Sequence, residues 1–185
     1  TLVELLRYRV GAPVSMSSLA RDLERAPKSV KRWISLLENL YVVFRIHPYH
    51  QNVARSLLKE PKIYFQDIAL VPDRGRRLEN LVACALLKEL DRLSDETGRK
   101  TKLCYLRTKD KRELDFAVVI DEKVTHLIEV KTSRDTLSKE IAHFSKFFPG
   151  VKKTQLVLNP KREKTFADGA EIRALAGWLT RLDLA

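Results

Sequence analysis

Two consecutive strand patterns in the second half of the chain constrain its fold more than any other feature. Residues 113–120 and 124–131 are rich in β-branched and apolar side chains, a composition typical of strands. The three residues 121–123 connect them, and a connection this short suits an antiparallel hairpin. The sequence therefore predicts two paired strands inside a sheet.

Acidic side chains interrupt both of these apolar strands. Because alternate side chains share one face of a strand, a register in which Ile120 pairs with Val124 sets Asp115 opposite Glu129. Opposed Cβ atoms lie about 4.5–5.5 Å apart, so the two carboxylates repel unless one takes up a proton or a cation lies between them. The alternative is a surface hairpin whose acids and lysine face water and pair across the strands.

The nature of these side chains indicates which cation they would hold. Oxygen ligands suit a hard ion such as Mg²⁺ or Mn²⁺, and Lys131 shares a strand face with Glu129. Water activated by such an ion, beside a lysine ammonium, suits attack on a phosphodiester. The constellation of Asp115, Glu129 and Lys131 is thus a candidate nuclease site.

The remaining elements of this half favour a mixed sheet flanked by helices, that is, an α/β fold (α+β for the whole chain). Helical periodicity predicts a long helix over 74–93, a second over 136–148 and a terminal helix over 172–182. Strands are expected at 102–107 and 153–158 as well. We assign this domain to residues 69–185.

Residues 1–68 read as a separate winged-helix-like domain. A short apolar stripe at residues 2–6 and helices over 17–24 and 27–40 precede strands at 41–46 and 62–65, with a basic, polar excursion at 47–61 between the strands. The inward positions of the third helix are Val30, Trp33 or Ile34, Leu37 and Leu40. Lys28, Lys31 and Arg32 lie on its remaining surface, where a DNA-binding member places its recognition residues. Such modules also serve as protein-docking linkers, and that reading stays open.

The charge balance and the lack of targeting signals limit which partners the chain is expected to have. A net charge of +11 attracts polyanions, so nucleic acid is the expected partner; solubility with an acidic protein partner is the alternative. The chain begins at Thr1 without a basic region followed by an apolar stretch, and it has no apolar segment long enough to cross a bilayer. These features predict a cytoplasmic fragment of a longer protein, with no membrane partner.

Several motifs together resemble a known family. The chain resembles the C-terminal region of a prokaryotic AAA-type ATPase family, in which a winged helix precedes a PD-(D/E)XK, or restriction-endonuclease-like, domain. The matching stretches are Ser18–Leu23, Lys31–Glu38, Lys62–Asp67, Leu78–Val82, Glu113–Phe116 and Ile128–Ser133.

The resemblance implies roles for individual residues. It makes Asp115 and Glu129 metal ligands, gives Lys131 the task of orienting water or phosphate, and adds Glu79 as a further ligand. A buried hydrogen bond or salt bridge, to Arg77 or Lys131, is the alternative interpretation of Glu79, which shares a helix face with apolar residues.

The same resemblance implies a partner, the family's own N-terminal AAA-type ATPase domain. No phosphate-binding loop of the Gly-x-x-x-x-Gly-Lys-Ser/Thr type occurs here, so this chain is not expected to hydrolyse ATP by that route. A Mg²⁺-dependent endonuclease is the first expected function. The alternatives are a catalytically inactive DNA-binding or docking tail and a helix-turn-helix regulator joined to an unrelated domain.

Overall fold

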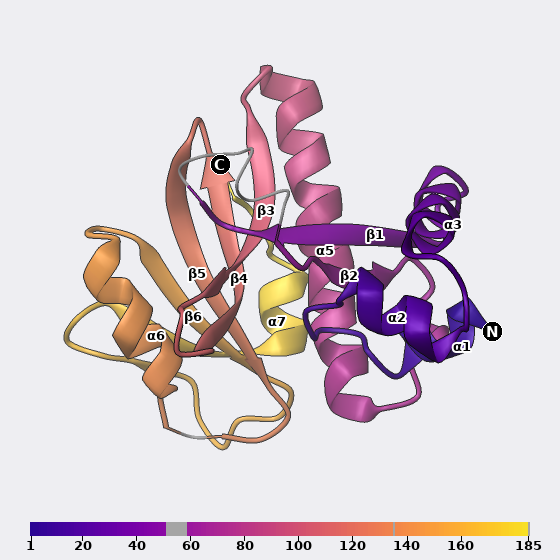
Figure 1. Ribbon diagram of the computed structural model, residues 1–185. Helices are drawn as coiled ribbons and strands as arrows, with labels where there is room; N and C mark the ends of the chain where they lie inside the picture. The colour runs from indigo at the N-terminus through magenta and orange to yellow at the C-terminus, as the bar shows by residue number, and fades with distance from the viewer. Residues whose placement is uncertain (51–58, 135, 185) are drawn as a thin grey trace. The chain divides into compact units, whose positions relative to one another are not determined.

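The computed structural model describes residues 1–50, 59–134 and 136–184 (Figure 1). The chain forms two compact units, Thr1–Cys84 (unit 1) and Ala85–Ala185 (unit 2). The division falls inside the long helix α5, Arg74–Thr97. The domain boundary expected between residues 68 and 69 stays a prediction.

Unit 1 consists of helices followed by an antiparallel strand pair. Its elements are α1 (Leu2–Arg7), α2 (Met16–Asp22), α3 (Pro27–Asn39), β1 (Val43–Pro48), β2 (Lys62–Phe65), the 3₁₀ turn η1 (Ile68–Leu70) and the first part of α5. β1 pairs with β2 from Val43 opposite Phe65 to Ile46 opposite Lys62. This order of elements matches the prediction, and the predicted excursion at 47–61 lies largely outside the described residues.

Local signals in the sequence set the helices of unit 1. The Ser15 side chain caps α2 by accepting a hydrogen bond from the Ser18 N–H, and Pro27 occupies the first turn of α3, where a missing N–H costs nothing. Val30 and Ile34 are the buried side chains of α3. Leu40, predicted to face inward, is 62% exposed because it forms the C-cap beyond the last helical turn.

Unit 2 is a mixed sheet with helices packed on it, which confirms the predicted α/β class. After α5 it contains β3 (Thr101–Arg107), β4 (Glu113–Ile120), β5 (Lys123–Lys131), α6 (Lys139–Phe144), the 3₁₀ turn η2 (Ser145–Phe147), β6 (Lys152–Val157), β7 (Lys164–Thr165), β8 (Ala170–Ala174) and α7 (Leu175–Leu179). β3, β4 and β5 pair antiparallel, β6 joins β5 and β8 in parallel, and β7 pairs antiparallel at the edge. α6 packs against β4, β5 and β6 (Figure 1).

The C-terminal segment differs from its prediction. Residues 172–182 were expected to form a helix, but Ile172 belongs to β8 and pairs with Gln155 of β6. Helix α7 starts at Leu175 and ends at Leu179. The apolar spacing of this segment permits either structure, and the open edge of β6 selects the strand.

The hairpin between β4 and β5 is tighter than predicted. Ile120 pairs with Lys123 rather than with Val124. Asp121 and Glu122 both have positive φ angles, 48° and 68°, as the two central residues of a type I′ turn require. The register then shifts between Val118 and Val119, which leaves Thr125 as an extra residue in β5. From the pair of Val118 and His126 onward, the strands follow the register that the sequence predicted.

The strained turn yields a stability prediction. Glu122→Gly should stabilise unit 2 by about 1 kcal/mol, because glycine removes the cost of a left-handed conformation while losing some chain entropy. Urea unfolding would measure the change, with Glu122→Ala as the control that keeps the Cβ atom. A stabilisation shared by the alanine variant would contradict the conformational explanation.

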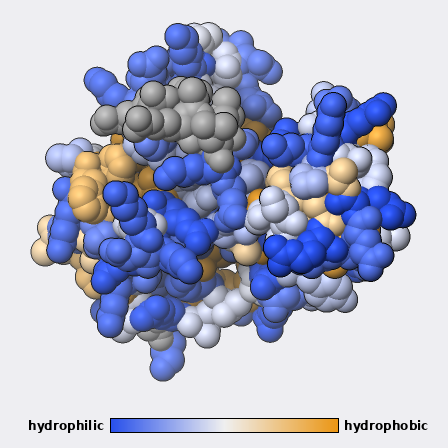
Figure 2. Space-filling model, viewed as in Figure 1, coloured by the Kyte–Doolittle hydropathy of each residue, from blue (hydrophilic) through white to orange (hydrophobic). Residues whose placement is uncertain are grey.

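The surface is largely polar. Hydrophilic residues cover most of the face shown in Figure 2, as expected for a chain in which 32% of residues are charged. Within the described ranges, no helix has the length and apolar character needed to cross a membrane.

Candidate functional site

Asp115 lies where β4 departs from regular pairing with β3. Cys104 pairs with Ala117 and Leu106 pairs with Leu114, so β4 has two residues, Asp115 and Phe116, where β3 has one. A β-bulge of this kind bends the strand and redirects a side chain. The irregularity therefore lies at the first residue of the predicted site.

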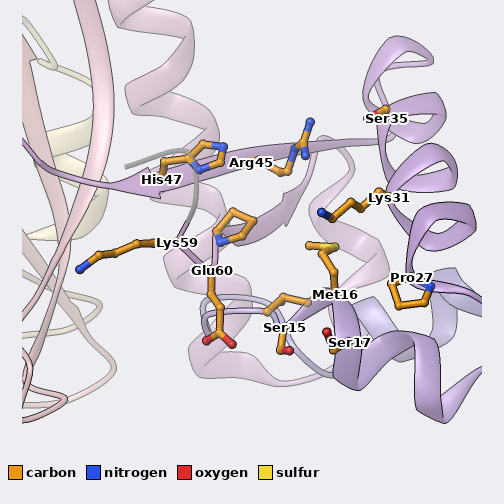
Figure 3. A pocket seen from close by; sticks show the side chains of 12 residues that line it. Ser15, Met16, Ser17, Pro27, Lys31, Ser35, Arg45, His47, Lys59 and Glu60 are labelled. Carbon is orange, nitrogen blue, oxygen red and sulfur yellow. The ribbon is translucent and has the colours of Figure 1, made fainter. Parts of the chain in front are cut away.

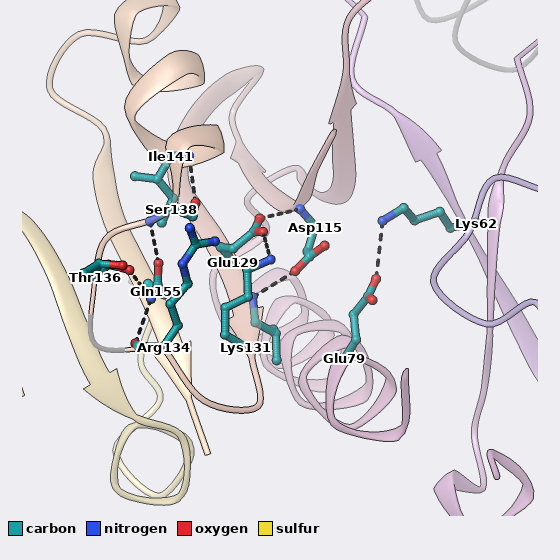
Figure 4. A network of polar contacts seen from close by, with 11 residues as sticks. Lys62, Glu79, Asp115, Glu129, Lys131, Arg134, Thr136, Ser138, Ile141 and Gln155 are labelled. Carbon is teal, nitrogen blue, oxygen red and sulfur yellow. Dashed lines mark hydrogen bonds and ion pairs between the residues drawn. The ribbon is translucent and has the colours of Figure 1, made fainter. Parts of the chain in front are cut away.

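The acidic side chains replace the backbone ladder between β4 and β5. Backbone pairing is regular at Phe116 and Ile128, and the same offset places Asp115 across from Glu129, as predicted. The Val130 N–H donates to Oδ2 of Asp115 at 2.8 Å, and the Asp115 N–H donates to Oε2 of Glu129 at 3.4 Å (Figure 4). Each carboxylate thus accepts a hydrogen bond from the backbone of the opposite strand, and the two carboxylates lie at the same site.

Glu129 is almost completely buried. Its exposed fraction is 2%, and its neighbours along β5, Ile128 and Val130, are buried as well. Burial, together with the charge of Asp115, raises the pKa of Glu129 to about 8, although Lys131 opposes the shift. An acid held in this way favours either a proton or a cation at neutral pH.

Lys131 completes the group. Its ammonium pairs with Oε1 of Glu129 while 31% of its side chain stays exposed. Burial alone would lower the pKa of Lys131, but the Glu129 and Asp115 carboxylates outweigh that effect and raise it. The lysine is therefore charged, and its partly exposed side chain lies where the site is open to solvent.

Gln155 supports the same region, and the sequence analysis gave it no role. It lies beside Glu129 in the parallel pairing of β5 and β6 and is fully buried. Its Oε1 accepts from the Ser138 N–H at 2.7 Å, and its Nε2 donates to the carbonyls of Arg134 and Thr136 (Figure 4). The amide thereby ties Arg134, Thr136 and Ser138 to β6. A glutamine inside an apolar strand was the available signal.

The donor chemistry at this site fits a hard divalent cation. Mg²⁺ is commonly held by one or two carboxylates and keeps several waters, and Asp115 and Glu129 are two carboxylates on facing strands. A cation would also offset the charge that raises the pKa of Glu129. Among the described residues, no group of three or more His, Cys, Asp or Glu side chains is arranged to hold a metal.

Glu79 contacts two side chains of unit 1. Its carboxylate accepts from the Tyr64 hydroxyl at 2.7 Å and from the Lys62 ammonium at 3.3 Å, and the Lys62 side chain is only 2% exposed. A hydrogen bond and a salt bridge were the expected alternative to a ligand role, but the cation found here is Lys62, whereas Arg77 or Lys131 was the expected partner. A contribution of Glu79 to metal binding stays a prediction.

The packing around Glu79 predicts a cost for a small substitution. A Cβ atom added at Gly11, whose φ is +75°, would lie 2.5 Å from Oε2 of Glu79. We therefore expect Gly11→Ala to destabilise the protein by about 2 kcal/mol, as measured by urea unfolding. Gly98→Ala is the matched control, since Gly98 has a φ of +70° but nothing within 4 Å of the added atom. Equal losses would show that Glu79 is not held tightly.

The basic residues predicted to contact nucleic acid lie on one helix. Lys28, Lys31 and Arg32 are all exposed on α3. Trp33 and Leu36, 37% and 53% exposed, share the surface of that helix, so it offers apolar as well as basic side chains. This mixture suits either nucleic acid or a protein partner.

Comparison with protein families gives two matches that overlap over α5. A family model described as "Domain of unknown function (DUF8612)" matches residues 1–100, and one described as "Domain of unknown function (DUF4143)" matches residues 74–176. The second match contains the acidic pair, Lys131 and Gln155.

Curated relatives extend the comparison to whole proteins. Proteins of Mycobacterium bovis and Mycobacterium tuberculosis, each titled as an uncharacterized protein, are 25% identical over 152 residues. The aligned region is 74% of this chain and 33% of each relative, so the chain spans about a third of the length of the curated relatives it matches. No solved structure gives a significant match.

Proposed function

The chain belongs to the DUF8612 family over residues 1–100 and to the DUF4143 family over residues 74–176, and from that premise we propose that it is a metal-dependent nuclease-like module acting on DNA. The observation that carries the proposal is the meeting of Asp115, Glu129 and Lys131 across β4 and β5. A buried glutamate and a half-buried aspartate beside a charged lysine can hold a cation that assists phosphodiester hydrolysis.

Each residue has a defined task in this proposal. Asp115 and Glu129 would hold Mg²⁺ or Mn²⁺, while Gln155 keeps the adjoining loop in place. When bound, the cation would polarise a phosphate oxygen and lower the pKa of water. A lysine ammonium has three N–H donors, of which the contact with Glu129 takes one, and another can donate to the phosphate or orient the attacking water.

We also propose the partners of the chain and its location in the cell. The winged-helix-like reading of unit 1 is supported by its helices, its antiparallel β1–β2 pair and the exposed basic residues of α3. The resemblance to AAA-type ATPases suggests an ATPase domain as the functional partner, in the cytoplasm. The net charge of +11 supports nucleic acid as the substrate.

A plasmid assay tests the activity. The wild-type protein should nick supercoiled DNA with Mg²⁺ or Mn²⁺, and Asp115→Asn should abolish nicking. Asp110→Asn, the same chemical change at an exposed residue, should not reduce it. Isothermal titration with Mn²⁺ measures binding separately from cleavage.

A non-catalytic docking or DNA-binding module is the second candidate. The exposed apolar side chains of α3 and its C-cap, Trp33, Leu36 and Leu40, favour it, since groups of such residues often mark interaction sites. DNA retained in a gel without nicking, and retained equally by Asp115→Asn, would support this candidate and reject the nuclease.

A further inference from the structure

Unit 1 contains a pocket that the proposed nuclease site does not use. It has a volume of about 460 Å³ and is bounded by α2, α3, β1 and the segment before β2 (Figure 3). Volumes of this size are typical of small-molecule sites. All of its lining residues lie within unit 1.

Cationic and hydroxyl side chains line the pocket. Lys31 of α3 extends toward its middle, and Arg45 and His47 line it from β1 (Figure 3). The hydroxyl groups come from Ser15, Ser17 and Ser35. Such N–H and O–H donors recognise phosphate oxygens. Lys59 and Glu60, of opposite charge, also line the pocket.

Arg45 is held in position at one wall. Its Nε donates to Glu38 at 2.8 Å, and its Nη2 lies 2.5 Å from the second carboxylate oxygen. A guanidinium has five N–H donors, so this fork-like pair fixes the group and leaves donors for a ligand. An arginine that is already ordered loses less entropy when it binds an anion.

Apolar side chains occupy the rest of the lining. Val14, Met16, Pro27 and Pro61 contribute them, and the Val14 N–H donates to the Pro61 carbonyl at 2.8 Å, which ties two of these segments together. Inorganic phosphate alone would leave most of a 460 Å³ space unfilled. The combination suits an anion attached to a flat apolar group.

We propose that this pocket binds a phosphorylated nucleotide, with Lys31 and Arg45 on the phosphate and the Met16 and Pro27 side chains against the base. The nucleotide can be free or can be the phosphorylated end of a nucleic acid strand, because both present the same chemistry. The inference goes beyond the proposed cleavage function, and the pocket contains none of Asp115, Glu129 and Lys131, so a failed nicking assay does not affect it; Lys31 alone is shared with the predicted nucleic-acid surface.

Calorimetric titration with adenosine 5′-monophosphate, using the whole chain, tests the proposal. Lys31→Gln should weaken binding at least about tenfold, the value of one charge-assisted hydrogen bond. Lys88→Gln is the matched control: the same change at an exposed lysine of helix α5 that does not line the pocket, and binding should change less than about twofold. Inorganic phosphate should bind more weakly than the nucleotide.

Two further measurements show whether the ligand is a free nucleotide or a strand end, and whether it binds in this pocket. A 5′-phosphorylated oligonucleotide that competes with the nucleotide, while its 5′-hydroxyl form does not, assigns the pocket to strand ends; competition by neither assigns it to free nucleotides. The NMR ring signals of His47 should shift during the titration. Equal losses in Lys88→Gln and Lys31→Gln, or no binding at about 1 mM, would overturn the proposal.

Discussion

Replacing Lys131 by methionine should lower the rate of Mn²⁺-dependent plasmid nicking by about 10²–10³-fold, the usual effect of removing one donor that stabilises transition-state charge. Methionine keeps the length and the apolar stem of the side chain, so packing around β5 is preserved. The substitution removes the ammonium that pairs with Glu129. The rate constant for cleavage under single-turnover conditions is the quantity to measure.

Cation binding separates this effect from a loss of the site. The ammonium and the cation compete for the Glu129 carboxylate, so Lys131→Met should bind Mn²⁺ no more weakly than the wild type. Lys123→Met, an exposed lysine of the same strand, is the control and should leave both rate and affinity unchanged. A Lys131→Met protein that nicks as fast as the wild type would rule out the assigned role of the lysine.

The meeting of the acids could be predicted because it depends on local rules. Strand alternation and a short connection are enough to bring Asp115 opposite Glu129, and both follow from neighbouring residues. The exact turn could not be predicted. The two-residue turn at Asp121 and Glu122 and the extra residue Thr125 compensate for each other, so the register at the site is correct although the first pair is not.

Features that depend on distant parts of the chain were missed. Ile172 is in a strand because β6 has an edge to pair with, and nothing near residue 172 reveals this. Gln155 gains its role from a parallel pairing across the α6 crossover and from carbonyls more than fifteen residues away. Which of the equivalent apolar positions of α3 are buried, Ile34 rather than Trp33, is likewise decided by tertiary packing.

Without metal, the buried carboxylate should make stability depend on pH. The pKa of Glu129 in the folded chain is raised from 4.5 to about 8, so between these values the folded protein binds more protons than the unfolded chain. The contribution of protonated Glu129 to the free energy of unfolding is therefore fully present below pH 4.5 and is lost as the pH rises through 8. With allowance for relaxation and for Lys131, the loss should be about 1–3 kcal/mol.

Glu129→Gln tests this cost directly, because glutamine resembles the protonated acid and cannot ionise. In chelator, the variant should unfold at a higher urea concentration than the wild type at pH 8.5, and the difference should shrink toward pH 5. Glu113→Gln is the control; Glu113 lies two residues from Asp115 and pairs with Arg107 at 3.1 Å, and its substitution should not reproduce that pH dependence. A Glu129→Gln protein less stable than the wild type at pH 8.5 would mean that Lys131 already compensates the buried charge.

The same variant should reverse its rank when Mn²⁺ is added. Binding to the folded state alone stabilises a protein by mass action, so the wild type should gain stability with each increment of Mn²⁺. The variant lacks one of the two carboxylates proposed to hold the ion, and its affinity should fall at least about 100-fold. The expected difference follows from one property of the site: burial beside Asp115 disfavours the charged form of Glu129, although Lys131 opposes this, and a bound cation would offset that cost. A variant that Mn²⁺ stabilises as strongly as the wild type would place the cation on other residues.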